Sequence, residues 1–399
     1  MSLNETVSAE RVHVGFFGMR NAGKSSLVNA VTGTSVSVVS DVKGTTTDPV
    51  RKAMELLPLG PVLIIDTPGI DDEGELGGMR VERTKKALAE TDVALIVIDA
   101  VTGESDEVRS LEESIKKRGI PYLKIYNKSD LLTEEDKRID GVIYASAKSG
   151  EGIESIKASL GKFAEKVKKT QPLVSDLISH GDTVILVTPI DEAAPKGRII
   201  LPQQMVLRDL LDSHARAIVC QPSELSDTLS ILKYPPKLVI TDSQVFGMVA
   251  KVLPTDIPLT SFSIIMARYK GELEALTEGF KALSEVKSGD KILISEGCTH
   301  HRQCGDIGSV KLPAWIKEYT NAVPEFHFTS GKDFPDNLNE YKLVVHCGGC
   351  MLNEAEMKNR LSASKEAGVP TVNYGIAIAG MKGILERSLR PFKEKKNEN

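Results

Sequence analysis

The chain has 399 residues, 41% of them hydrophobic, which is enough for two or three domains with separate cores. Its formal net charge of −5 and its pI near 5.9 argue against a dedicated nucleic-acid-binding protein, which would usually carry a basic face or tail. Residues 1–11 lack the pattern of a secretory signal, and no apolar run approaches the length of a membrane span. We therefore expect a cytoplasmic protein that does not enter the membrane. Cysteines in a reducing compartment are poor material for disulfides, and three of the five lie beside a histidine or in a Cys-x-x-Cys pair, so metal ligation is expected of these. Cys220 closes an apolar run and is expected to be a packed core thiol.

Residues 12–17 form an apolar run that predicts a buried strand. This strand leads directly into the pattern G-x-x-x-x-G-K-S, which runs from Gly18 to Ser25. Glycines in such a loop let backbone N–H groups approach phosphates, Lys24 reaches the terminal phosphates, and Ser25 offers a hydroxyl to Mg²⁺. The complete pattern in this setting predicts a nucleotide-binding loop rather than a simple helix entry.

A second short apolar run, residues 62–65, ends in Asp66-Thr67-Pro68-Gly69. Here Asp66 is expected to hold Mg²⁺ through water, and the Gly69 amide is expected to sense the terminal phosphate. The next residue is Ile70, where Ras-like enzymes carry a glutamine that orients the attacking water. Hydrolysis must therefore be organised differently in this chain.

Residues 44–48, Gly-Thr-Thr-Thr-Asp, resemble the first switch loop of such proteins. Thr46 is the threonine expected to meet Mg²⁺, with Thr45 and Thr47 as alternatives. Residues 71–78 are polar and glycine-rich, which fits a mobile second switch and fits an ordinary solvated loop equally well.

Two further apolar runs, residues 123–126 and 142–144, end in motifs that resemble the guanine-reading elements of the GTPase superfamily. An aspartate carboxylate can accept two hydrogen bonds from guanine, whereas adenine offers no such pair of donors, so GTP is predicted rather than ATP. The residues of these two motifs are Asn127, Lys128, Asp130, Ser146, Ala147 and Lys148.

The whole region resembles the Era and TrmE branch of bacterial GTPases, in which an asparagine at the position of Asn21 accompanies potassium-dependent activity. The resemblance implies a potassium-activated GTPase in which Asn21, Lys24 and Thr46 are catalytic. The residues implied to bind GTP and Mg²⁺ are Gly18, Asn21, Gly23, Lys24, Ser25, Ser26, Thr46, Asp66, Gly69, Asn127, Lys128, Asp130, Ser146, Ala147 and Lys148.

After residue 170 the chain alternates short apolar runs with helical patterns, which favours parallel sheets. We predict an α/β chain of three domains: a P-loop GTPase domain at 1–170, and two smaller α/β domains with mainly parallel sheets at 171–265 and 266–399. The middle domain carries no chemical constellation, so self-association is its expected role.

In the last domain, Cys298 and Cys347 each follow a predicted strand, at residues 291–294 and 343–345. Because sites in open α/β sheets lie beyond the carboxyl ends of the strands, two parallel strands could bring these cysteines together. Cys347 and Cys350 form a C-G-G-C turn, in which the glycines allow a tight bend and offer N–H groups to sulfur. Zinc, a redox dithiol, an iron-sulfur cluster and a purely structural turn all remain possible for it.

The extended pattern Cys298-Thr299-His300, followed by His346-Cys347-Gly348-Gly349-Cys350, resembles the signature of the FeFe-hydrogenase maturation GTPase family, HydF. The resemblance spans the full chain and implies that Cys298, Cys347 and Cys350 hold a 4Fe-4S cluster. The fourth iron position is implied to be exchangeable, and the candidates for it are His300, His346 and Glu296. Cys304 is a rival thiol outside the signature.

By this resemblance, the chain is a GTP-hydrolysing scaffold that carries the cluster and a di-iron precursor and delivers the precursor to apo-FeFe-hydrogenase. Other hydrogenase maturation proteins are implied as partners, as is a homodimer or higher homo-oligomer. The alternative is an RNA-processing or ribosome-assembly GTPase with a structural zinc site. The acidic composition of the chain argues against this alternative, because RNA-binding proteins usually carry a basic surface. A dithiol redox enzyme ranks last, because no thioredoxin pattern accompanies the C-x-x-C turn.

Overall fold

The structure is a computed structural model that describes residues 8–33, 49–70, 75–133, 139–167, 171–190, 199–270, 273–298 and 306–396. These residues form two compact units, one built from residues 8–167 and 353–356 and the other from residues 171–352 and 357–396. Among the helices of the described ranges, none has the length and apolar composition needed to cross a membrane.

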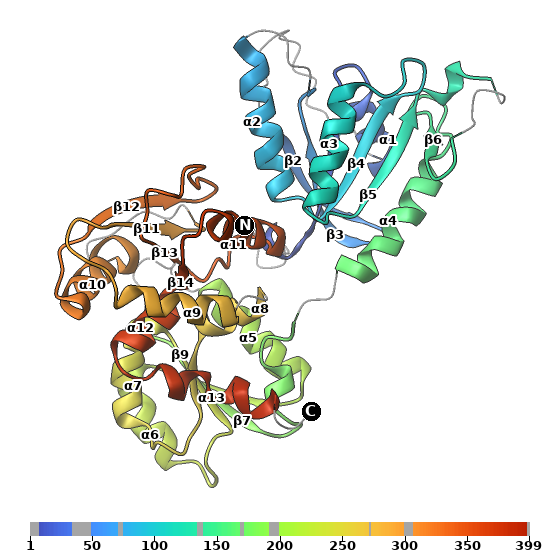
Figure 1. Cartoon of the computed structure of the whole chain (residues 1–399). Coiled ribbons are helices and arrows are strands. Elements are labelled where there is room, and N and C mark those ends of the chain that lie inside the picture. Colours follow the sequence, from blue (N-terminus) through green and yellow to red (C-terminus); the bar gives the residue numbers. More distant parts are fainter. Residues whose placement is uncertain are drawn as a thin grey trace. The chain divides into compact units, whose positions relative to one another are not determined.

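The first unit contains a six-stranded sheet with the strand order β2-β3-β1-β4-β5-β6 (Figure 1). All neighbours in it are parallel except β2 and β3. Its elements are β1 (Val12–Phe17), α1 (Lys24–Thr32), β2 (Val50–Leu56), β3 (Gly60–Asp66), α2 (Glu75–Ala89), β4 (Val93–Asp99), α3 (Asp106–Lys117), β5 (Tyr122–Asn127), β6 (Ile143–Ala145) and α4 (Ile153–Val167).

Strand β4 shows why this sheet is covered by helices on both faces. Its residues alternate between two apolar clusters, because successive side chains of a strand point to opposite faces. Leu95 and Val97 belong to the cluster that also contains residues of α1 and α4. Ala94 and Ile96 belong to the cluster that contains residues of α2 and α3. A strand buried on both faces reads as one continuous apolar run, as this one does.

Helix α3 illustrates how the covering helices are specified locally. The Ser105 side chain accepts a hydrogen bond from the Val108 amide and so caps the first turn. Val108, Leu111 and Ile115 are buried, and their spacing places them on one face of the helix toward the sheet. Acidic residues in the first turn and basic residues in the last turn complement the helix dipole.

The second unit contains two four-stranded parallel sheets, with the orders β10-β9-β7-β8 and β12-β11-β13-β14 (Figure 1). The elements of the first half are β7 (Thr183–Val187), α5 (Leu201–Asp212), β8 (Arg216–Cys220), α6 (Leu225–Ser230), β9 (Leu238–Thr241), α7 (Phe246–Val252), β10 (Leu259–Ser261) and α8 (Phe262–Tyr269). Those of the second half are α9 (Leu273–Leu283), β11 (Lys291–Glu296), α10 (Leu312–Thr320), β12 (Glu325–Ser330), β13 (Leu343–His346), α11 (Glu354–Glu366), β14 (Thr371–Asn373), α12 (Tyr374–Met381) and α13 (Leu385–Lys396).

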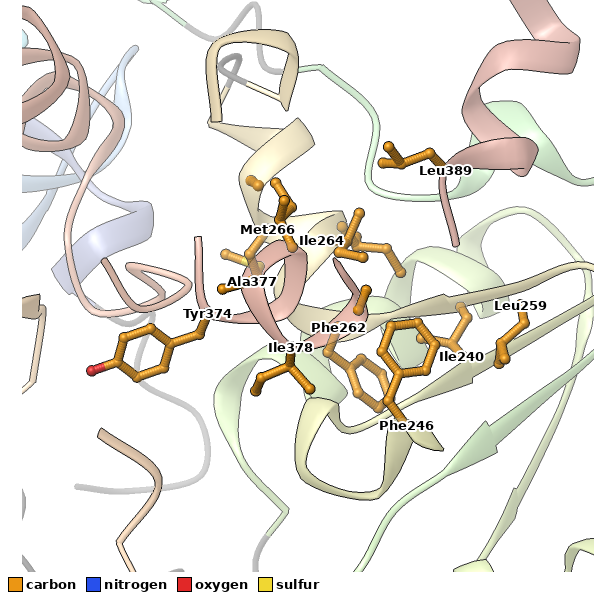
Figure 2. Packing of buried hydrophobic residues seen from close by; sticks show 14 of the residues in the cluster. Ile240, Phe246, Leu259, Phe262, Ile264, Met266, Tyr374, Ala377, Ile378 and Leu389 are labelled. Atoms are coloured by element: carbon orange, nitrogen blue, oxygen red, sulfur yellow. The ribbon is translucent and has the colours of Figure 1, made fainter. Parts of the chain in front are cut away.

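One apolar core joins the two halves of this unit. Figure 2 shows Phe262 of α8 beside Ile378 of α12, with Ile240 and Leu259 from the strands of the first half in the same cluster. The predicted boundary after residue 265 falls inside α8, which is a continuous helix. The two halves therefore share buried apolar surface, and α8 carries residues of the first half into contact with the second.

Candidate nucleotide site and cysteine cluster

The predicted phosphate loop lies between the end of β1 and the start of α1. Gly18 has φ +146°, and a Cβ there would lie 2.1 Å from the Val97 carbonyl oxygen. Gly23 has φ +84°, and a Cβ there would lie 2.3 Å from Asn127 Nδ2. Both positions therefore require glycine, for backbone conformation and for space.

Lys24, the first residue of α1, is held across this loop. Its ammonium donates hydrogen bonds to the carbonyl oxygens of Gly18, at 3.0 Å, and Met19, at 2.8 Å. Lys24 is only 7% exposed. The loop thus fixes a buried positive charge at the point where the motif predicts the terminal phosphates of the nucleotide.

Two residues predicted to serve Mg²⁺ lie in contact. The Ser25 hydroxyl donates a 2.5 Å hydrogen bond to Asp66 Oδ2 at the end of β3. Burial raises the pKa of Asp66, while the Ser25 hydrogen bond and the Lys24 charge act in the opposite direction. The other oxygen, Oδ1, is buried and has no hydrogen-bond partner in the described part of the chain. A hydroxyl beside a carboxylate with an unsatisfied buried oxygen fits Mg²⁺ and its water ligands.

The predicted guanine-reading residues lie on two loops, and both loops connect to the phosphate loop through Asn127. Asn127 Nδ2 donates to the Ala22 carbonyl at 2.9 Å, and its Oδ1 accepts from the Ala147 amide at 3.2 Å. The Ser146 hydroxyl donates to Asp130 Oδ1 at 2.7 Å, which orients that carboxylate. The phosphate loop and both guanine motifs are therefore tied into one site.

The structure describes only some of the other residues that are predicted to bind GTP and Mg²⁺. Asn21 has φ +63°, so it holds a left-handed conformation at the apex of the phosphate loop. Lys128 also has a positive φ, and its ammonium pairs with Asp99 at 2.6 Å. The Lys148 amide donates to the Ser146 hydroxyl at 3.2 Å. Ser26 is exposed and Gly69 is half-buried, whereas Thr45, Thr46, Thr47 and residues 71–74 lie outside the described ranges.

The two cysteine-bearing strands are direct neighbours in the second unit. Strands β11 and β13 pair in parallel, with Ser295 opposite His346. Cys298 follows the end of β11, and Cys347 follows β13 immediately. The strand ends therefore lie side by side at the same edge of the sheet, where sites of parallel α/β folds are built.

Backbone donors surround the Cys347 sulfur. Its Sγ accepts hydrogen bonds from the Gly297 amide at 3.0 Å and the Gly349 amide at 3.3 Å. Gly349 has φ +62°, and a Cβ there would lie 2.6 Å from Met357 Sδ. Peptide donors of this kind stabilise a thiolate or a metal-bound sulfur, and one of the two comes from a glycine of the turn itself.

The three thiols influence one another. Burial raises the pKa of Cys298, and the neighbouring Cys347 and Cys350 raise it further. Burial and Cys347 raise the pKa of Cys350 to about 11, and the Lys270 charge acts in the opposite direction. Within the described ranges, no group of three or more His, Cys, Asp and Glu side chains is gathered closely enough to hold a metal ion. Three cysteine thiols, with peptide N–H groups that donate to one of the sulfurs, are nevertheless the ligand and donor types found around iron-sulfur clusters.

The fourth-ligand candidates differ in their surroundings. His346 is buried; its Nδ1 donates to the Cys347 carbonyl at 2.8 Å, and its Nε2 accepts from Arg360 at 3.2 Å. Burial and the Arg360 charge lower the pKa of His346 to about 3, so the ring is neutral with both nitrogens engaged. Glu296 is buried near the thiols and accepts a 3.4 Å hydrogen bond from the Tyr374 hydroxyl, which Figure 2 shows pointing away from the apolar core. His300 and Cys304 lie outside the described residues.

Three residues at this site were not predicted from the sequence: Lys270, Arg360 and Tyr374. Lys270 directly follows α8, Arg360 lies within α11, and Tyr374 is the first residue of α12. None of the three lies within a recognised motif, so their place at the site depends on the tertiary structure.

Family models match most of the chain. The hydrogen maturase F dimerization domain matches residues 173–271, and the hydrogen maturase F tetramerization domain matches residues 274–391. A model described as 50S ribosome-binding GTPase matches residues 13–128.

The chain belongs to the hydrogen maturase F family. This confirms the resemblance predicted from the Cys298 and Cys347 segments. The predicted fold class is confirmed as well, because the chain combines a GTPase domain with two further α/β parts whose sheets are parallel.

Bacterial GTPases are among the curated relatives of this chain. GTPase Der of Kosmotoga olearia is 32% identical over 220 residues, covering 50% of this chain and 49% of that protein. The tRNA modification GTPase MnmE of Nitrosomonas europaea is 36% identical over 160 residues, covering 39% of this chain and 35% of that protein. The chain thus spans about half the length, or less, of these relatives.

Solved structures were matched at lower identity. An Era variant of Aquifex aeolicus bound to GDP and AlF4⁻ is 20% identical, with a TM-score of 0.34, and covers 52% of this chain and 92% of that chain.

Proposed function

We propose that this chain is a GTP-hydrolysing scaffold in FeFe-hydrogenase maturation. It would bind a 4Fe-4S cluster, carry a di-iron precursor and deliver that precursor to apo-hydrogenase. Membership of the hydrogen maturase F family and the GTPase domain support this proposal. The observation that carries it is the pairing of β11 with β13, which sets Cys298 and Cys347 at neighbouring strand ends in a chain that also holds a complete phosphate loop.

In this proposal, Cys298, Cys347 and Cys350 are the protein ligands of the cluster, which supplies electron transfer and an exchangeable iron position. Glu296 is a better fourth-ligand candidate than His346, because both nitrogens of His346 already have partners within the fold. A carboxylate is a weaker iron ligand than a thiolate and is more easily displaced by an incoming group. Such a ligand suits a carrier that must release its cargo.

GTP binding and hydrolysis would act as a switch on loading or partner release rather than on the chemistry of iron. The nucleotide would be held by the phosphate loop, the Asp66 region and the guanine-reading residues described above. The dimerization and tetramerization domains support a homo-oligomeric scaffold. Apo-hydrogenase and other maturation proteins would be its partners.

Anaerobic reconstitution of the full chain with iron and sulfide tests the cluster assignment. We expect about four iron atoms per chain and, after reduction, the electron paramagnetic resonance signal of a 4Fe-4S cluster. Zinc bound in stoichiometric amount with no cluster signal would contradict the scaffold. It would instead favour a GTPase with a structural zinc site.

Potassium is the proposed activator of GTP hydrolysis. Ile70 is buried and apolar, so it cannot orient the attacking water as a glutamine does. A monovalent cation near Asn21 would supply part of the missing charge stabilisation. We expect turnover to be at least about tenfold faster in potassium than in sodium buffer of equal ionic strength, and this difference to vanish in Asn21→Ala. Equal rates of the unmodified protein in both buffers would remove this role of Asn21.

A further inference from the structure

Lys270 places a positive charge beside the C-G-G-C turn. It follows the last residue of α8, is 4% exposed, and donates a 2.8 Å hydrogen bond to the carbonyl of Leu352, two residues beyond Cys350. The helix itself lies against the turn, because a Cβ at Gly348 would be 3.6 Å from both Met266 and Ser263. The first half of the second unit thus contributes a buried cation to a site whose cysteines all belong to the other half.

Arg360 places a second buried charge near the same turn. This α11 residue is 1% exposed, and its guanidinium donates to the Gly331 carbonyl at 2.7 Å and to Ser295 Oγ at 3.3 Å. It also donates to His346 Nε2 at 3.2 Å, and Nδ1 of that ring donates to the Cys347 carbonyl. Arg360 is therefore connected through one imidazole ring to the peptide unit of a proposed cluster ligand.

We propose that Lys270 and Arg360 are positioning residues whose fixed positive charges set the reduction potential of the cluster held by Cys298, Cys347 and Cys350. This inference rests on the proposed function, since it requires the cluster to be bound there. The step is a one-electron reduction by an external reductant such as dithionite, and no covalent bond forms or breaks. Added negative charge is stabilised by nearby buried cations, because Coulomb interactions are strong in a poorly solvated site.

The charge of Lys270 can be separated from its structural role. Glutamine keeps a hydrogen-bond donor for the Leu352 carbonyl but removes the charge, whereas arginine keeps the charge. Lys237, an exposed lysine before β9, gives the matched charge-removing control as Lys237→Gln. Arg360→Gln tests the second cation independently.

The test is an electron paramagnetic resonance titration of the reconstituted full-length variants with dithionite. At a fixed potential, Lys270→Gln should have a ratio of reduced to oxidised cluster about tenfold lower than the unmodified protein, equivalent to about 59 mV for one electron. Arg360→Gln should shift the ratio in the same direction. Lys270→Arg and Lys237→Gln should keep the original ratio.

Iron and sulfide content and thermal unfolding are measured on each variant to separate the outcomes. A normal cluster with unchanged potential in both uncharged variants would overturn the inference and leave the proposed function standing. Absence of any cluster in the unmodified protein would instead overturn the proposed function. If one uncharged variant fails to fold, the other decides; if both fail, the residues are structural and the inference is overturned.

Discussion

Replacing Lys24 by alanine should lower the rate of GTP hydrolysis by roughly 100- to 1000-fold, the usual effect of removing one preorganised group that stabilises transition-state charge. The ammonium is buried and held by two carbonyl oxygens of the phosphate loop, at 3.0 and 2.8 Å. It is thus preorganised, and little reorganisation is needed when charge develops on the transferring phosphate. Turnover measured as phosphate release at saturating GTP, together with GTP affinity, gives the size of the loss.

The matched control is Lys117→Ala, which removes an exposed lysine from the last turn of α3 in the same unit. Its turnover should stay close to that of the unmodified chain. Circular dichroism of Lys24→Ala should show that the fold persists. A folded Lys24→Ala variant with a normal rate would contradict the assignment of the phosphate loop as the hydrolytic site.

Replacing Cys347 by serine should lower the iron content after anaerobic reconstitution by about tenfold or more. Cys347 Sγ accepts two peptide N–H hydrogen bonds, so its loss removes a thiolate that the surrounding backbone is arranged to stabilise. A serine hydroxyl is a harder and less acidic donor, which is a poor substitute for a thiolate on iron. Iron and sulfide analysis and the resonance signal of the reduced protein measure the effect.

Cys220→Ser is the control for this substitution. Cys220 is a buried thiol at the end of β8 and packs in the shared apolar core, as its sequence context predicts. Its replacement changes a cysteine of the same unit and should leave the iron content unchanged. If both variants lost the cluster equally, the effect of Cys347→Ser would reflect folding rather than ligation.

Local chemistry explains which parts of the site were predictable. The phosphate loop follows a strand with six buried residues, and the turn from strand to helix requires glycine at set positions. The motif therefore specifies the backbone conformation of the loop by itself. The cysteines were predictable as neighbours because each follows a parallel strand, and such strands end at one edge of a sheet. Strand β2 was missed because most of its side chains are exposed or half-buried, so it lacks an apolar run.

The surroundings of the cysteines could not be predicted in this way. A lysine 80 residues before Cys350 and an arginine in a later helix carry no motif, and only the packing of α8 and α11 buries them beside the turn. The same packing engages both nitrogens of His346, which the sequence alone leaves as an equal candidate for iron. Adjacent residues encode backbone turns and ligand types, whereas the burial and partners of long side chains depend on contacts between distant segments. The sequence thus identified the nucleotide loop and the thiols, and the folded arrangement identified the charges and hydrogen bonds that act on them.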